Sequence, residues 1–141
     1  MNRLNTAVNA LIDAYSQERI HSASCRKCAV GTIILESTGQ SSDKWWRTLL
    51  SFVTGEMDLE DSLYANYLEK ATGYTLMEIY LIEAAFEGEP FIPGIRRLAQ
   101  SSDVSLEQRL ADVIERLHWL EEHSEEDVRH EASTMIQSYR V

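Results

Sequence analysis

The stretch Thr75-Leu-Met-Glu-Ile-Tyr-Leu-Ile-Glu-Ala-Ala-Phe-Glu87 decides how this chain folds. Thr75 and Glu78 have the spacing of a capping box, in which two side chains bond each other's backbone N–H at the start of a helix. This spacing predicts a helix over about residues 75–87. Apolar side chains cover nearly all of its circumference, which is typical of a buried helix. We therefore expect this helix in the middle of the fold.

Two carboxylates interrupt the apolar surface of this helix. Glu83 and Glu87 share a face with Leu76 and Tyr80. A carboxylate at a buried position is either ionised and paired or has a raised pKa. We interpret Glu83 and Glu87 as buried structural acids that pair with an arginine or accept hydrogen bonds from a helix N-terminus. The alternatives are a ligand-binding group and a general base in an enzyme centred on Glu83.

Helical periodicity continues on both sides of this stretch. A first helix, about residues 3–17, carries one apolar stripe made by Leu4, Val8, Leu11, Ile12 and Tyr15. Capping residues and apolar spacing predict further helices over about 43–55, 58–73, 105–122 and 124–139, with a short helical piece over 95–99. The helix that Asp58 starts carries four apolar residues in register, Leu59, Leu63, Tyr67 and Leu68.

Few turn-forming residues separate these segments. The chain has 6 Gly and 2 Pro in 141 residues, which argues against an all-β fold. Residues 36–42 are expected to form a loop. We predict an all-α fold, with residues 1–141 as one compact domain of about six or seven helices packed antiparallel.

Composition excludes several classes of protein. The net charge of −10 disfavours nucleic-acid binding, because an acidic surface repels phosphate. No apolar run reaches the roughly 20 residues of a membrane span, and the first residues lack the features of a secretory signal. We therefore expect a cytoplasmic protein with reduced thiols. Residues 1–47 carry six basic and four acidic side chains, and this positive third either packs against the acidic remainder or meets a partner.

The segment His21–Leu35 holds the only two cysteines, Cys25 and Cys28. A serine at position 22 or 24 can cap a helix that contains both cysteines and continues to Ile34. Gly31 and the β-branched residues that follow it weaken this interpretation, and a short strand is the alternative.

The Cys-x-x-Cys spacing has three interpretations. The thiols are small core residues, a zinc site, or a redox pair. A zinc site requires four ligands, so His21 is the candidate for a third. The fourth would be a carboxylate, a second subunit, or one of three histidines, His118, His123 and His130. Packing is the leading interpretation, because one isolated Cys-x-x-Cys pair is a weak motif.

Two pairs of residues have the spacing of di-iron ligands, Glu115 with His118 and Asp127 with His130. At about 100° per residue, both pairs fall away from the apolar faces of their helices. We therefore expect these side chains to be solvated.

The three tryptophans are candidate interface residues. Trp45 and Trp46 are adjacent, so they point about 100° apart on a helix and cannot both face one core. Trp119 lies off the apolar stripe of its helix. A tryptophan outside a core can anchor a partner or a second subunit. The alternative is that another helix covers it.

Two further strings of the sequence are Ser24-Cys-Arg-Lys-Cys-Ala-Val-Gly31 and Ala71-Thr-Gly-Tyr-Thr-Leu-Met-Glu-Ile-Tyr-Leu-Ile-Glu-Ala-Ala-Phe-Glu87. Together they resemble a family of short bacterial and phage-associated proteins without an established activity. The resemblance covers about half of the chain and assigns no role to the matched positions. Because it includes both the cysteines and Glu83, we also consider a thiol–carboxylate site between the two segments.

Catalytic and nucleotide-binding motifs are absent from the sequence. The leading hypothesis is therefore a non-enzymatic protein-interaction or regulatory module without a cofactor, which binds a protein partner or forms a homodimer. The alternative is a zinc-binding or thiol-redox protein that uses Cys25 and Cys28.

Overall fold

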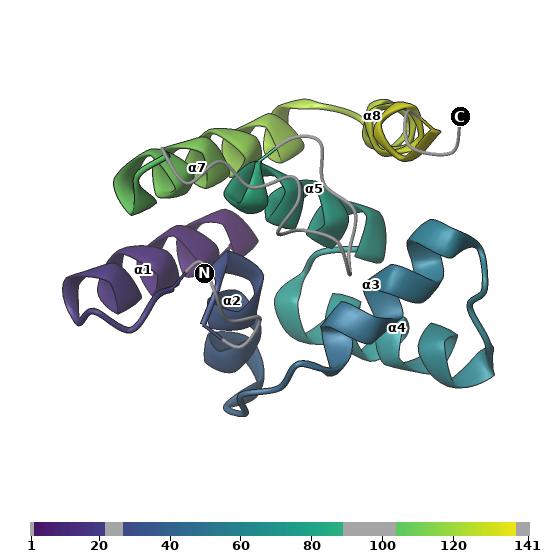
Figure 1. Cartoon of the computed structure of the whole chain (residues 1–141), viewed down its shortest axis with the longest axis horizontal. Helices are drawn as coiled ribbons and strands as arrows, with labels where there is room; N and C mark the ends of the chain where they lie inside the picture. The colour runs from purple at the N-terminus through teal and green to yellow at the C-terminus, as the bar shows by residue number, and fades with distance from the viewer. Residues whose placement is uncertain (1, 22–26, 89–103, 138–141) are drawn as a thin grey trace.

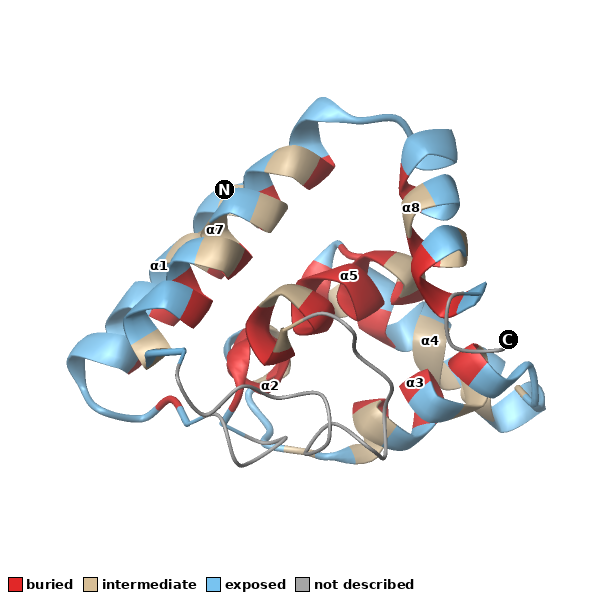
Figure 2. Ribbon diagram, turned by 45° about the horizontal axis from the view of Figure 1, so that its top comes forward, coloured by how far each residue is buried: buried red, intermediate tan, exposed pale blue. Residues whose placement is uncertain are grey.

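Helix α5 (Leu76–Glu87) runs through the centre of the structure and is buried on nearly every side (Figure 2). The structure is a computed structural model that describes residues 2–21, 27–88 and 104–137. Ten of the twelve residues of α5 are buried. The Thr75 side chain accepts a hydrogen bond from the Glu78 backbone, and the Glu78 side chain accepts one from the Thr75 backbone. The predicted capping box is therefore confirmed.

Seven α-helices and no strand occur in the described ranges, so the predicted all-α fold is confirmed. Besides α5, the helices are α1 (Arg3–Ser16), α2 (Ala29–Thr38), α3 (Lys44–Thr54), α4 (Leu59–Thr72), α7 (Leu106–Glu122) and α8 (Glu125–Gln137). The short helical piece predicted over 95–99 lies outside the described residues, and so does Tyr139.

The other helices surround α5 (Figure 1). Helix α7 packs along α5 and also contacts α1, while α8 is seen nearly end-on beyond the last turn of α7. Helices α3 and α4 lie together on the side of the molecule away from α1 and α7. One continuous apolar core joins side chains from all seven helices.

The segment after the cysteines differs from the prediction in both bounds. Cys28 is the N-cap of α2 and does not lie inside the helix, and α2 continues to Thr38, three residues into the predicted loop. The strand alternative is wrong. The first six residues of α2, Ala29–Ile34, are all buried, and this packing outweighs the weak helix propensity of their β-branched members. Gly39 then ends the helix with φ 76°.

Helix α1 presents a different face to the core than its large apolar residues suggest. Its buried residues are Leu11 and three alanines, Ala7, Ala10 and Ala14. Ile12 and Tyr15 are exposed. Leu11 and Ile12 are adjacent and point about 100° apart, so only one of them can face the core. The small alanines let α1 lie close against its neighbours.

The turn between α4 and α5 depends on a glycine. Gly73 is the C-cap of α4 with φ 83°, a left-handed conformation that costs other residues energy. A Cβ at Gly73 would lie 3.0 Å from Cβ of Arg3, on the first turn of α1. A side chain at position 73 would therefore require Arg3 to shift by a few tenths of an ångström.

Substitution of this glycine tests the close approach. Gly73→Ala should destabilise the fold by the left-handed strain of about 1–2 kcal/mol plus about 1–3 kcal/mol for overpacking against Arg3. Gly39→Ala is the matched control, because Gly39 also has a positive φ of 76° but has no atom within 4 Å of the added Cβ. Urea denaturation measures both free energies of unfolding. Equal losses would show that Arg3 does not crowd this turn.

Candidate functional site

The structure places Cys28 in the core. Its side chain is fully buried, and its Sγ accepts a hydrogen bond from the Gly31 backbone N–H at 3.4 Å. Cys25 lies outside the described residues. His21 is exposed, and its backbone N–H donates to the Lys27 carbonyl at 2.7 Å. Within the described ranges, no three His, Cys, Asp or Glu side chains are grouped to hold a metal. The zinc and thiol-redox hypotheses stay predictions.

Cys28 lies beside Glu83, which comes from the middle of α5. Burial raises the pKa of the Cys28 thiol well above its ordinary value, and the charge of Glu83 raises this pKa further. The charge of Glu87 acts in the same direction. Glu83 and Glu87 are themselves buried, at 0% and 1% exposure. The structure therefore joins the two segments of the thiol–carboxylate hypothesis, but it holds the thiol protonated and poorly nucleophilic.

A buried guanidinium lies at the end of α5. Arg109, from the first turns of α7, is 5% exposed and its Nη1 donates to the Phe86 carbonyl at 2.8 Å. This bond satisfies one of the carbonyls that every helix C-terminus leaves open. Sequence reasoning expected an arginine near the buried acids but did not identify Arg109. Its spacing to Val113 and Leu117, at i+4 and i+8, places it on the apolar stripe of α7 and could have identified it.

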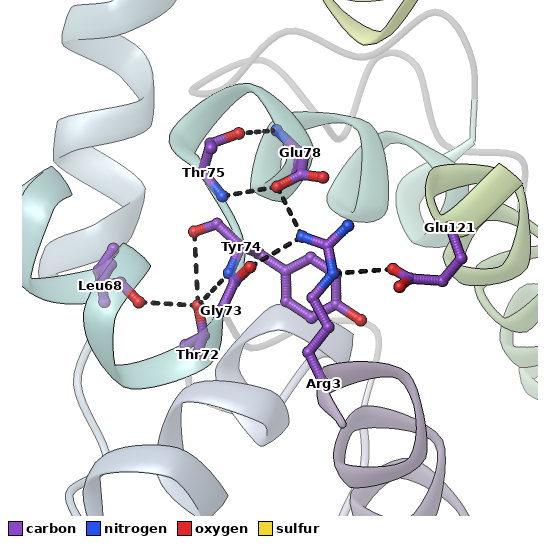
Figure 3. Close-up of polar contacts among 8 residues, drawn as sticks. All are labelled: Arg3, Leu68, Thr72, Gly73, Tyr74, Thr75, Glu78 and Glu121. Atoms are coloured by element: carbon purple, nitrogen blue, oxygen red, sulfur yellow. Dashed lines mark hydrogen bonds and ion pairs between the residues drawn. The ribbon is translucent and has the colours of Figure 1, made fainter. Parts of the chain in front are cut away.

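Arg3 connects three helices (Figure 3). Its Nη1 donates to Oε1 of Glu78 at 2.9 Å and to the Gly73 carbonyl at 2.8 Å. Its Nε donates to Oε2 of Glu121 at 2.8 Å. The guanidinium also lies over the Tyr74 ring, with 4.4 Å between its carbon and the ring centroid. One side chain of α1 thus holds the α4–α5 turn and the last turn of α7 together.

The tryptophans occupy three different environments. Trp45 is fully buried and packs edge-on against Trp46 at a ring separation of 5.5 Å, so the prediction of Trp45 as an interface residue is wrong. Trp46 and Trp119 are half-buried. Trp119 stacks on the His123 ring at 4.1 Å, and Arg116 covers it at 4.8 Å. For Trp46 and Trp119, the partner-anchor hypothesis stays a prediction.

The side chains with di-iron spacing are solvated, as predicted. Glu115 and His118 on α7 are exposed, and so are Asp127 and His130 on α8.

The most unusual surface of the described chain is the outer face of α4. Leu59, Leu63 and Tyr67 are 75%, 60% and 51% exposed, whereas Leu68 is fully buried. The four residues therefore do not share one face. Tyr67 and Leu68 are adjacent and point about 100° apart, so their spacing already separates an outer stripe from the core side. We call the face with Leu59, Leu63 and Tyr67 the outer α4 face.

Side-chain contacts order the edge of the outer α4 face. Nζ of Lys44 lies 3.5 Å from Oε1 of Glu60 and 4.8 Å from the Tyr64 ring centroid. The Tyr64 ring stacks on the Tyr67 ring at a centroid separation of 6.0 Å. These contacts restrict the rotamers of Lys44, Glu60, Tyr64 and Tyr67, so these side chains lose less conformational entropy when a partner binds beside them.

Comparison with protein families, with characterised proteins and with solved structures finds no match to this chain. No helix in the described ranges combines the length and apolar character that crossing a bilayer requires.

The protonated thiol gives a measurable result. In a Cys25→Ser variant, Cys28 should react slowly with a thiol reagent at pH 8 in the native protein and completely after unfolding in guanidinium. Above about pH 8.5 the unfolded thiol ionises while the folded thiol keeps its proton. Stability that is fully present below that pH should therefore fall as pH rises, by at most about 1.4 kcal/mol per pH unit for this group.

Urea denaturation at pH 8 and pH 10 measures this loss. Cys28→Ala is the control, because removing the thiol should make the loss of stability smaller. The pKa of Tyr74 is also raised by burial, so part of the loss should remain in this variant. A native thiol that reacts as fast as the unfolded one would contradict the buried, protonated state.

Proposed function

We propose that this chain is a non-enzymatic protein-interaction module, and that its outer α4 face binds a partner helix with a matching apolar stripe. The exposure of three aligned large residues, Leu59, Leu63 and Tyr67, carries this proposal. Their spacing of four residues places them in line along one side of α4.

The fold itself does not use this stripe. Leu68 already supplies a large apolar contact from α4 to the core, and Thr72 is buried beside it. Contiguous apolar side chains on a protein surface mark an interaction site, because burying them against a partner removes apolar area from water. Tyrosine is also enriched at protein interfaces.

The polar side chains outside the outer α4 face favour a protein-binding function over an enzymatic one. Glu83 and Glu87 lie inside the core, where a substrate of ordinary size has no access. A groove of about 650 Å³ lies between α4, α5 and α8. Three of the groups that line it are already committed, because Arg3 pairs with Glu78 and the Thr75 hydroxyl caps α5.

Site-specific cross-linking tests the proposal. A photoreactive residue in place of Tyr67 should give one discrete adduct in the host that makes the protein. The same residue in place of Glu69, which is exposed on another side of α4, should not give it. The adduct should disappear when Leu59 and Leu63 are both changed to Gln. No adduct from position 67, or equal adducts from both positions, would overturn the proposal.

The same substitutions should leave the fold intact. Leu63→Gln should change the unfolding free energy by less than about 0.5 kcal/mol, because the side chain is exposed. Leu68→Ala on the same helix should cost about 2–5 kcal/mol. Thermal or urea denaturation of dilute protein measures both. A large loss from Leu63→Gln would show that the stripe serves the fold and not a partner.

A further inference from the structure

We infer that the partner helix is α4 of a second copy of this chain, packed antiparallel with its two-fold axis near Leu63. This inference rests on the proposed function and names the occupant of the outer α4 face.

The apolar stripe is complementary to itself. Leu59 and Tyr67 lie four residues before and after Leu63. An antiparallel pair centred on Leu63 therefore places Leu59 against the partner's Tyr67 and Leu63 against the partner's Leu63. Such an interface uses the same patch on both copies, which is the arrangement of most homodimers. The stripe from Leu59 to Tyr67 extends over nine residues, about 12 Å of helix.

The charges on α4 select the antiparallel direction. The first turn of α4 is acidic, with Glu60 and Asp61, and its last turn carries Lys70. At about 100° per residue, Lys70 lies within about 20° of Leu59 around the helix. Glu60 lies beside the stripe, and its ion pair with Lys44 is exposed on both sides, so the Glu60 carboxylate can also meet a cation of a second copy. An antiparallel pair centred on Leu63 brings the Lys70 end of one α4 toward the acidic end of the other, with Lys70 about 6 Å along the helix axis from the partner's Glu60, a distance that the long lysine side chain can span. A parallel pair instead brings like charges together.

The size of the face indicates a weak, reversible dimer. Helix α4 has 14 residues, so it is about 21 Å long. Two such helices bury less than the roughly 1,600 Å² of a standard interface. The net charge of −10 on each copy also opposes association at low ionic strength. Dimerisation should therefore depend on protein concentration and be stronger at about 0.15 M salt than at 0.01 M salt, where screening is weak.

Sedimentation equilibrium of the full chain at increasing concentration is the first test. The wild type should pass from monomer to dimer, and Leu63→Glu should remain monomeric at every concentration. Ser62→Glu is the matched control, because it adds the same charge to an exposed neighbour that lies off the stripe. This control should dimerise like the wild type. Circular dichroism of each variant shows whether it is folded.

A charge exchange tests the direction of the pair. Glu60→Lys and Lys70→Glu should each weaken dimerisation, by about tenfold for the two symmetric contacts. The double variant should recover it, because each new lysine again meets a new glutamate across the interface. Recovery is expected only of the antiparallel arrangement. Loss without recovery would overturn the proposed geometry.

The mass of the adduct from position 67 separates this inference from the proposed function. An adduct of twice the chain mass, together with a sedimenting dimer, supports both. A discrete adduct of any other mass, with a wild type that stays monomeric, overturns the homodimer and leaves the interaction module in place. A monomeric wild type that gives no adduct overturns both.

Discussion

The fold depends on the burial of α5 on all sides. A helix with apolar side chains around its whole circumference must be enclosed by other helices, and here α2, α4, α7 and α8 all contact it. The helices around α5 must also accommodate acidic side chains, because Glu78, Glu83 and Glu87 are buried with the apolar residues. The elements around α5 must therefore together supply polar contacts as well as apolar area.

The neighbouring elements meet this requirement in different ways. Helix α1 supplies Arg3, which binds the Glu78 carboxylate and the carbonyl of the turn before it. The N-cap of α2 supplies the Cys28 thiol beside Glu83. Helix α7 supplies the Arg109 guanidinium to the last turn of α5. Sequence-distant segments are thus fixed against one helix by polar contacts that apolar packing alone would not specify.

Several ends of α4 and α5 were predictable from the sequence, because local side chains determine them. The Thr75 capping box, the Asp58 N-cap and the Gly73 C-cap all lie where their spacing places them. The orientation of each helix was less predictable. On α4, apolar residues occur on two sides, and only tertiary packing decides that Leu68 faces inward. The prediction of Cys28 inside a helix is wrong, because its role as an N-cap depends on a backbone geometry that the sequence does not display.

The contact between Arg3 and Glu121 has a consequence for synthesis on the ribosome. The two residues are 118 positions apart. At about 5–20 residues per second, Arg3 leaves the peptidyl-transferase centre about 6–24 s before Glu121 is added. During this interval α1 lacks the surface of α7 that covers it in the finished fold, and α5, which ends 34 residues before Glu121, lacks it for the last part of the interval. The apolar faces of the nascent chain therefore remain exposed until α7 is synthesised. This delay favours binding by chaperones that act on chains as they emerge from the ribosome.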